Sequence, residues 1–366
     1  MDIASAPLDN ARYRALEHPA GERYLEVLDQ RALPHTVARL RIADANGAAA
    51  AIRDMIVRGA PLIGAVGAYG LALALDADPT DEGLARGHAM LDAARPTAVN
   101  LRWALDRVRD RVSGMPPARR ADAAWDEADT IRDEDVAINA ALGRHGLALL
   151  SDLARGRDRP VNVMTHCNAG ALATCGFGTA TAPIFLAHEA GVPIHVWVSE
   201  TRPRLQGANL TAWEFAERGI HHTLIVDGAS GLLMQRGDVD IVIVGADRVA
   251  RNGDVCNKIG TYDKALAARD NDVPFYVALP SPTIDWHTAS GAGIPIEARS
   301  SREVLEVRGR DAGGESASVV VAGRATPALN YAFDVTPQRL VTGYITERGV
   351  ATSIARLHEL FEERLS

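Results

Sequence analysis

The sequence is poor in cysteine and has no concentration of basic charge. Its three cysteines include no C-x-x-C pair, so neither a disulfide framework nor a zinc ribbon is indicated. The 39 basic and 47 acidic residues give a net charge of −8 without a basic tail, which argues against nucleic-acid binding. The longest apolar run, Leu62 to Leu75, has about 14 residues, fewer than the roughly 20 of a membrane-spanning helix.

The first 24 residues carry scattered charges and no apolar core of a secretion signal. The chain also shows no internal repeat and no low-complexity linker. We therefore expect a cytoplasmic protein with reduced thiols that binds neither nucleic acid nor a membrane. The acidic total still permits an anionic small substrate, because a site can be locally basic.

The organisation of the chain changes near residue 150. With 366 residues, 47% of them hydrophobic, the chain is long enough for about two domains. Residues 1–150 predict a smaller, mainly helical domain with a short antiparallel sheet, and residues 151–366 predict an α/β domain. The first domain should contain strands at 25–29 and 36–41, helices at 45–55, 61–75, 84–93 and 98–112, and one or two helices over 118–150.

After residue 150, short apolar runs alternate with helical patterns. The expected strands are Val161–Thr165, Ile194–Ser199, Thr223–Asp227, Ile241–Gly245 and Phe275–Leu279. Continuous apolar strands of this kind indicate a Rossmann-like, mostly parallel sheet covered by helices on both faces. The carboxyl ends of parallel strands open on one edge of the sheet, where ligands bind. We expect a loop over residues 309–318 and a final amphipathic helix over 351–365.

Reactive side chains follow three of these strands. Cys167 comes after the first, Glu200 after the second and Asp247 after the fourth. Each alone also fits a structural role: Cys167 as a small buried hydrophobe, Asp247 as a cap or turn residue, and Glu200 as an ion-pair partner of Arg202. Their recurrence at one sheet edge favours a shared catalytic site.

A second pattern indicates binding of a small anion. Arg58-Gly59-Ala60-Pro61 directly precedes a helix, and its backbone N–H groups are free at the positive end of the helix dipole. Arg95 precedes another helix, Gly176-Phe177-Gly178 starts a third, and Asn257-Lys258 comes before a fourth. These groups together predict a substrate held by arginine, lysine and backbone amides.

Two cofactor classes are disfavoured by the same residues. The Gly176–Gly178 pair lacks the third glycine of a dinucleotide fingerprint, because Thr181 stands in that place. The pairs His166–Cys167 and His221–His222 are adjacent in sequence and so do not face one metal ion, and no H-E-x-x-H motif occurs. We expect neither a nucleotide cofactor nor a metal.

Ordered motifs along nearly the whole chain resemble those of the methylthioribose-1-phosphate isomerases of methionine salvage. That family is related to the regulatory subunits of eukaryotic initiation factor 2B. The matching blocks are Arg58–Pro61, Arg95–Asn100, Thr165–Gly170, Glu200–Gly207, Gly245–Arg248, Asn257–Thr261 and Pro280–Asp285. The resemblance implies a small N-terminal domain on a Rossmann-like domain, a homodimer, and catalysis without a metal or nucleotide.

The resemblance also assigns roles to residues. It implies that Cys167 is catalytic and that Asp247 is the acid or base. It implies substrate contacts from Arg58, Gly59, Ala60, Arg95, Gln206, Asn257 and Lys258. The reaction of the family opens a furanose 1-phosphate and moves hydrogen from C2 to C1, through either an enolate or a hydride shift.

Two other functions fit the same sequence. One is the same isomerisation of a related sugar, 5-deoxyribose 1-phosphate or ribose 1,5-bisphosphate. The choice depends on whether the pocket for the 5-substituent is apolar or basic. The other is a non-catalytic regulatory protein like the initiation-factor subunits, which has no need of Cys167 and Asp247 together with the arginine and lysine set.

Overall fold

The computed structural model describes residues 14–95, 99–323 and 325–364. The N-terminal part begins with a three-stranded antiparallel sheet, β1 (Leu16–Glu17), β2 (Leu25–Leu28) and β3 (Arg39–Ile42). The helices that follow are α1 (Ala45–Arg53), α2 (Ala60–Ala77), α3 (Asp81–Asp92), α4 (Val99–Val112) and α5 (Pro117–Ala154). The region expected as one or two helices is thus a single helix of 38 residues. The expected start of α4 at residue 98 falls outside the described residues.

Helix α2 is the centre of the N-terminal core. It packs between α1, α3, α4 and α5, and its Leu62, Val66, Tyr69 and Leu71 have no exposed surface. The helix has 18 residues, so the length argument against a membrane span was wrong: by length and composition it could cross a membrane. However, 78% of the helix is buried inside the fold, as in the core helix of a globular protein.

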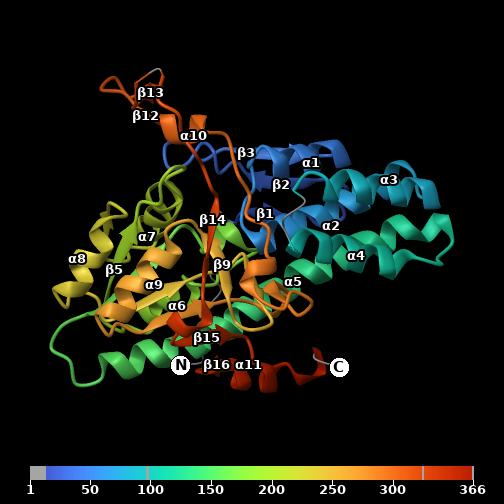
Figure 1. The fold of residues 1–366 in the computed structure, drawn as a ribbon. Helices are drawn as coiled ribbons and strands as arrows, with labels where there is room; N and C mark the ends of the chain where they lie inside the picture. The colour runs from blue at the N-terminus through green and yellow to red at the C-terminus, as the bar shows by residue number, and fades with distance from the viewer. Residues whose placement is uncertain (1–13, 96–98, 324, 365–366) are drawn as a thin grey trace.

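A seven-stranded sheet forms the second part of the molecule (Figure 1). Its order is β16-β15-β10-β7-β4-β5-β6, and every pair is parallel except β15–β16. The bounds are β4 (Val161–His166), β5 (Ile194–Ser199), β6 (His222–Ile225), β7 (Ile241–Val244), β10 (Phe275–Ala278), β15 (Gly343–Thr346) and β16 (Gly349–Ala351). The α/β fold class is confirmed, with a parallel-dominated sheet.

Helices complete both faces of this sheet. They are α6 (Ala182–Glu189), α7 (Ala212–Glu217), α8 (Ala229–Gln235), α9 (Thr261–Asp270) and α11 (Ile354–Leu360). Alternate strand residues enter different cores: Val163 and Ile243 pack with Phe185, whereas Met164 and Val242 pack with Phe275. The chain leaves β4 towards β5 and β6 on one side and adds β7, β10 and β15 on the other. The strand order therefore reverses at β4, where ligands bind in open α/β sheets.

Smaller elements lie beside the large sheet. A four-stranded sheet has the order β11-β8-β9-β14, with bounds Ile284–Asp285, Arg248–Ala250, Val255–Lys258 and Phe333–Thr336. Short helix α10 (Arg302–Leu305) leads into a hairpin, β12 (Glu306–Arg310) and β13 (Ser316–Val320), which projects from the body in Figure 1. The remaining 3-10 turns are Ala171–Ala173, Ser281–Thr283, Gly291–Gly293, Gln338–Leu340 and Glu362–Arg364.

Two expectations for this region were wrong, and one was confirmed. Residues 309–318 form a hairpin rather than a plain loop, because backbone pairs such as Val307 with Val319 close a two-stranded ladder. The Asn257-Lys258 pair does precede a helix, because α9 starts at Thr261, and the pair itself ends the buried strand β9 of the small sheet. The last helix starts at Ile354 because β16 takes up the residues before it.

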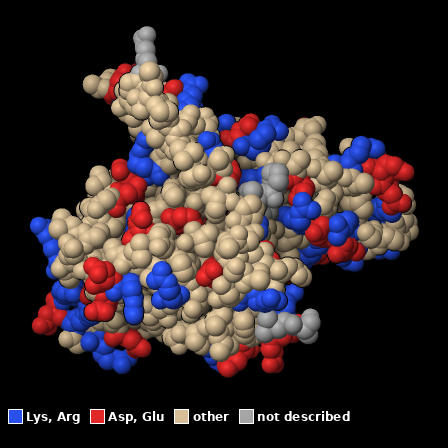
Figure 2. Space-filling model, viewed as in Figure 1, with Lys and Arg blue, Asp and Glu red and all other residues tan. Residues whose placement is uncertain are grey.

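On the face in Figure 2, acidic and basic side chains are interspersed.

Candidate active site

A cavity of about 470 Å³ opens at the carboxyl ends of β4 and β7, against the start of α2. Its lining includes all nine residues proposed from the sequence: Arg58, Gly59, Ala60, Arg95, Cys167, Gln206, Asp247, Asn257 and Lys258. Glu200 and Arg202 are not part of the lining, and the expected ion pair between them is not formed. The Arg202 guanidinium instead donates to the carbonyl of Val304 at 2.8 Å.

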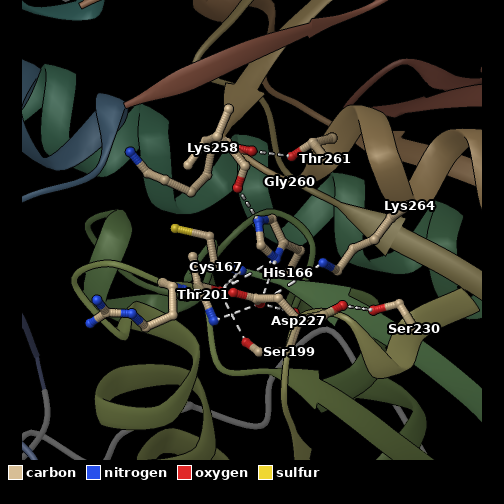
Figure 3. A network of polar contacts seen from close by, with 12 residues as sticks. His166, Cys167, Ser199, Thr201, Asp227, Ser230, Lys258, Gly260, Thr261 and Lys264 are labelled. Atoms are coloured by element: carbon tan, nitrogen blue, oxygen red, sulfur yellow. Dashed lines mark hydrogen bonds and ion pairs between the residues drawn. The ribbon is translucent and has the colours of Figure 1, made fainter. Parts of the chain in front are cut away.

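Cys167 follows β4 directly and is 7% exposed. Its backbone has a φ of +62°, in the left-handed region that costs a non-glycine residue about 1–2 kcal/mol. The Cys167 N–H donates to the Thr201 hydroxyl at 2.8 Å, a bond that offsets part of this cost. In Figure 3 the thiol points to the same side as the Lys258 ammonium. The fold thus holds an unfavourable backbone conformation at the thiol.

Asp227 anchors the loop that carries Thr201 (Figure 3). Its carboxylate accepts the N–H groups of Thr201 at 2.9 Å and Arg202 at 2.7 Å, and the hydroxyl of Ser199. Lys264, 2% exposed, places its ammonium 3.9 Å from this carboxylate. Burial opposes ionisation of Asp227, but the hydrogen bonds and the Lys264 charge together lower its pKa below the ordinary value. Asp227 is therefore a fixed anion behind Thr201.

His166, beside the catalytic candidate, is neutral. Its Nε2–H donates to the carbonyl of Ile259 at 2.8 Å, and its ring is fully buried. Burial, helped by the charge of Lys264, lowers the pKa of His166 to about 3. The imidazole therefore carries no positive charge at neutral pH and acts as a rigid support under Cys167.

Asp247 follows β7 and faces the cavity. Its backbone N–H donates to the carbonyl of Cys256 at 3.0 Å, which ties the turn to β9. Within residues 14–95, 99–323 and 325–364, no side chain or backbone group donates a hydrogen bond to its carboxylate. Cys167, Asp247 and Lys258 all line the same cavity. The thiol and the carboxyl group therefore face one space, and the carboxyl group is available to a substrate.

Eight basic side chains line the cavity, and four of them, Arg58, Arg95, Lys258 and Arg299, form one cluster whose charges act on one another. Burial, together with the charge of Arg299, lowers the pKa of Lys258 to about 8 and that of Arg95 to about 10. Glu297 pairs with Arg299 at 2.8 Å. This cluster of cations gives the wall of the cavity a positive charge, which suits a phosphate monoester.

Lys258 has lost most of its contact with water. It is 6% exposed, donates to the carbonyl of Ala332 at 2.9 Å and lies 4.0 Å from the ring centre of Phe333. Both lysines of the sequence, Lys258 and Lys264, are thus buried in or behind this site. Burial deprives the Lys258 ammonium of its hydration. An anion bound in the cavity would compensate for this loss by a favourable charge–charge interaction.

Arg58 is oriented by Asn168. The guanidinium donates to the Asn168 side-chain oxygen and, at 2.7 Å, to the Asn168 carbonyl. Asn168 is in turn held by Glu214, to which its amide donates at 2.8 Å. The next residue, Gly59, has a φ of +104°, and a Cβ there would lie 2.4 Å from the carbonyl oxygen of Ala173. Only glycine therefore lets the chain turn into α2 at this wall of the cavity.

Two polar residues complete the proposed binding set. Gln206 is 7% exposed, and its side-chain oxygen is buried without a hydrogen-bond partner. A buried, unpaired amide oxygen beside a cavity is a ready acceptor for a ligand hydroxyl. The Asn257 amide donates to the Thr261 hydroxyl at 3.1 Å, which holds its side chain at the cavity wall.

Sequence reasoning missed several lining or supporting residues. Arg299 and Glu297 lie in an irregular segment that carries no strand-end or helix-start signal. Asn168 stands in the Thr165–Gly170 block, so its position next to Cys167 was a usable signal for a supporting role. Among the described residues, no group of three or more His, Cys, Asp or Glu side chains is placed to hold a metal ion.

Comparison with known proteins defines the class of this chain. Residues 56–353 match the model of the initiation factor 2 subunit family, and the chain belongs to this family. Within it, the chain is similar to proteins named methylthioribose-1-phosphate isomerase. That of Rhodospirillum rubrum is 57% identical over 92% of this chain and 89% of its own length. That of Paramagnetospirillum magneticum is 54% identical over 98% and 99%.

Solved structures give the same two branches. A crystal structure of 5-methylthioribose 1-phosphate isomerase from Pyrococcus horikoshii is 40% identical, with a TM-score of 0.82 over 96% of each chain. The translation initiation factor eIF-2B subunit delta from A. fulgidus is 36% identical, with a TM-score of 0.78 over 95% of this chain and 99% of that one. The resemblance stated from the motifs is therefore confirmed.

Proposed function

We propose that this chain converts 5-methylthioribose 1-phosphate to 5-methylthioribulose 1-phosphate, an aldose–ketose isomerisation of methionine salvage. Relatives with this activity in their names are 53–57% identical over nearly the whole chain. The observation that carries the proposal is the single cavity in which Cys167, Asp247 and the cation cluster meet. A thiol and a carboxyl group beside an anion site are the groups that this reaction requires.

The cation cluster holds the phosphate on C1. Arg58, Arg95 and Lys258 bind its oxygens, and Arg299 contributes charge from the same wall. This anchoring fixes C1 and C2 before bond changes begin, which removes the entropic cost of orienting the sugar. The phosphate on the anomeric oxygen also keeps the ring closed, so the protein itself must open it.

Asp247 supplies the acid and Cys167 acts at the carbon centres. The Asp247 carboxyl group gives its proton to the ring oxygen as the bond from C1 to that oxygen breaks. The Asp247 carboxylate left by this step then takes the proton of the C2 hydroxyl, the C2 hydrogen reaches C1, and C2 becomes the ketone carbon. The C2 hydrogen travels either as a hydride or as a proton that Cys167 removes to give an enolate and then returns to C1. Substrate deuterated at C2 separates the routes: retention supports the hydride shift, and washout into water supports the enolate.

The remaining lining favours an apolar group on C5. Three of the four other basic residues of the lining, which are Arg31, Arg204, Arg302 and Arg308, already form ion pairs. Arg31 pairs with Asp29 at 2.8 Å, Arg204 with Glu303 at 2.6 Å and Arg302 with Glu306 at 2.7 Å. The lining also includes the apolar residues Leu33, Met55, Pro203, Leu205, Leu210 and Phe333. A second phosphate on C5 would need further unpaired cations, whereas a methylthio group needs apolar surface.

We also propose that the chain works as a homodimer in the cytoplasm. The family resemblance supports the dimer, and the three free cysteines suit a reducing compartment. Sedimentation velocity of the purified protein tests the dimer, since a single monomeric species would contradict it.

The activity is tested with three substrates and two variants. We expect turnover of methylthioribose 1-phosphate to exceed that of 5-deoxyribose 1-phosphate and ribose 1,5-bisphosphate. Cys167→Ser and Asp247→Asn should each abolish turnover while calorimetry still detects product binding. Cys175→Ser is the matched control, because Cys175 is a buried thiol outside the cavity lining. Full activity in either site variant would refute the residue roles, and no turnover by the wild-type protein would refute the function.

A further inference from the structure

Two buried threonine hydroxyls form hydrogen bonds with the backbone of Cys167, one with its N–H group and one with its carbonyl. Thr201 accepts the Cys167 N–H at 2.8 Å, and Thr211 donates to the Cys167 carbonyl at 2.6 Å. Neither threonine has exposed surface. Because the backbone between these two bonds lies in the left-handed region, both hydroxyls act on a conformation that a cysteine rarely adopts without support.

Thr211 reaches this position because its helix is locally widened. Residues Gly207–Thr211 form a π-helical turn, in which the N–H of Ala212 bonds to the carbonyl of Gly207. In an α-helix, residues five apart point about 140° away from each other. In a π turn the i→i+5 hydrogen bond reduces this offset, so Gln206 and Thr211 point more nearly in the same direction. Gln206 lines the cavity, and Thr211 contacts the residue that carries the thiol.

The start of the π turn is fixed against β5. A Cβ on Gly207 would lie 1.8 Å from the carbonyl oxygen of Ser199, so only glycine permits this approach. The widened turn is therefore fastened to the end of the strand from which the Thr201 loop departs. One segment, Ser199 to Thr211, supplies both hydroxyls that hold Cys167.

The hydrogen-bond network fixes the direction of the Thr211 hydroxyl. The Asn168 amide donates to the Thr211 oxygen at 3.1 Å, so the hydroxyl proton is left for the Cys167 carbonyl. Asn168 also donates to Glu214 at 2.8 Å, and it binds Arg58 through its oxygen and its carbonyl. Removal of the Thr211 hydroxyl therefore takes away one of the two hydrogen bonds that hold the Cys167 backbone, whereas Asn168 and Arg58 stay anchored by Glu214.

We propose that Thr211 is a positioning residue for the isomerisation: the π turn presents its hydroxyl to the Cys167 carbonyl, and this bond holds the thiol against the substrate. The proposal rests on the role given above to Cys167. It predicts a specific division of effects, because the phosphate contacts do not depend on Thr211. The rate of the chemical step should fall while substrate affinity is kept.

The test compares Thr211→Val, which has the same shape but no hydroxyl, with Thr211→Ser, which keeps the hydroxyl. The control is Thr346→Val, since Thr346 is equally buried, donates to the Gly349 carbonyl at 2.9 Å and does not line the cavity. For each variant, kcat, KM, thermal stability and product binding are measured. Alkylation of Cys167 by iodoacetamide is followed by peptide mass spectrometry.

In Thr211→Val we expect kcat to fall about tenfold, equivalent to about 1.4 kcal/mol, with KM and product affinity within twofold of wild type. Its Cys167 should alkylate at least threefold faster, because the thiol loses one of its two backbone restraints. Thr211→Ser should recover most of kcat, and Thr346→Val should change only stability.

Three results would overturn the proposal: unchanged kcat in Thr211→Val, no recovery in Thr211→Ser, or an equal loss of kcat in Thr346→Val. If the wild-type protein turns over none of the sugars, the proposed function fails. The alkylation rates then decide the role of Thr211 alone, since they require no turnover: equal rates in wild type and Thr211→Val would refute it.

Discussion

Replacement of Lys258 by methionine should make the empty protein more stable and its substrate binding weaker. Burial, with the neighbouring charge of Arg299, lowers the pKa of Lys258 from 10.5 to about 8. The charged ammonium therefore destabilises the ligand-free fold, and we expect its interaction with a bound anion to offset this cost. Methionine has a similar length and no charge, so it removes the cost and the function together.

The magnitude follows from the pKa shift. A depression of about 2.5 units corresponds to about 3 kcal/mol at 1.36 kcal/mol per unit. The variant also loses the hydrogen bond to the Ala332 carbonyl, worth about 1 kcal/mol. We expect Lys258→Met to unfold in urea with about 2 kcal/mol more free energy than wild type at pH 7. Loss of a charge-assisted bond of about 1.5–3 kcal/mol should raise KM about 10- to 100-fold.

The pH dependence gives an independent check. Below pH 8, Lys258 is charged in both the folded and the unfolded chain, and the fold carries the full cost. Between pH 8 and 10.5 the unfolded chain binds the extra proton, so the contribution of Lys258 to stability rises with pH. Wild type should therefore gain stability relative to Lys258→Met over this range, while its affinity for product falls.

Urea unfolding without ligand and calorimetry with product, both from pH 7 to 10, measure these two trends. A variant less stable than wild type at pH 7 would show that Lys258 supports the fold instead of being held at a cost. A KM within twofold of wild type would show that the ammonium does not bind the phosphate.

Two further changes test the walls of the cavity. Gly59→Ala should lose at least about 2 kcal/mol of unfolding free energy in urea and raise KM, because the added Cβ would lie 2.4 Å from the Ala173 carbonyl oxygen. The control is Gly21→Ala, which has a positive φ but no atom within 4 Å of the added Cβ and should lose only about 1 kcal/mol in the same assay. Arg299→Ala should raise KM about tenfold in steady-state kinetics. Arg356→Ala, which removes an arginine from an exposed ion pair on α11, should leave KM unchanged. Equal KM values in the two variants would contradict a role for Arg299 in binding.

The main sheet could be predicted because its strands are short apolar runs bounded by turn residues. Residues 241–244 are fully buried, so their sequence is continuously apolar and leaves little ambiguity. The shared location of Cys167 and Asp247 followed from the topology, since parallel strands bring both residues to one edge, whereas their roles were implied by the family resemblance. The structure places both residues on one cavity, while their catalytic roles stay a prediction.

The missed elements are those that depend on distant partners. Strand β14 pairs with β9 across more than seventy residues of chain, and four residues give no period that separates a strand from a loop. Arg299 enters the site from an irregular segment whose course is set by such pairings. The hydrogen bonds from Thr201 and Thr211 to the Cys167 backbone could not be predicted, because neither a left-handed residue nor a π turn has a recognisable sequence pattern here.

The lysine content of the chain has a practical consequence. Every other basic side chain is arginine or histidine, and Lys258 and Lys264 are 6% and 2% exposed. Amine-directed reagents therefore find no lysine on the outer surface to label or cross-link. A small acylating probe that enters the cavity would react with one ε-amino group, that of Lys258. Because the pKa of Lys258 is lowered to about 8, this amine is more nucleophilic near pH 8 than the amine of an ordinary lysine. Protection of that amine by bound product would give a chemical footprint of the occupied site.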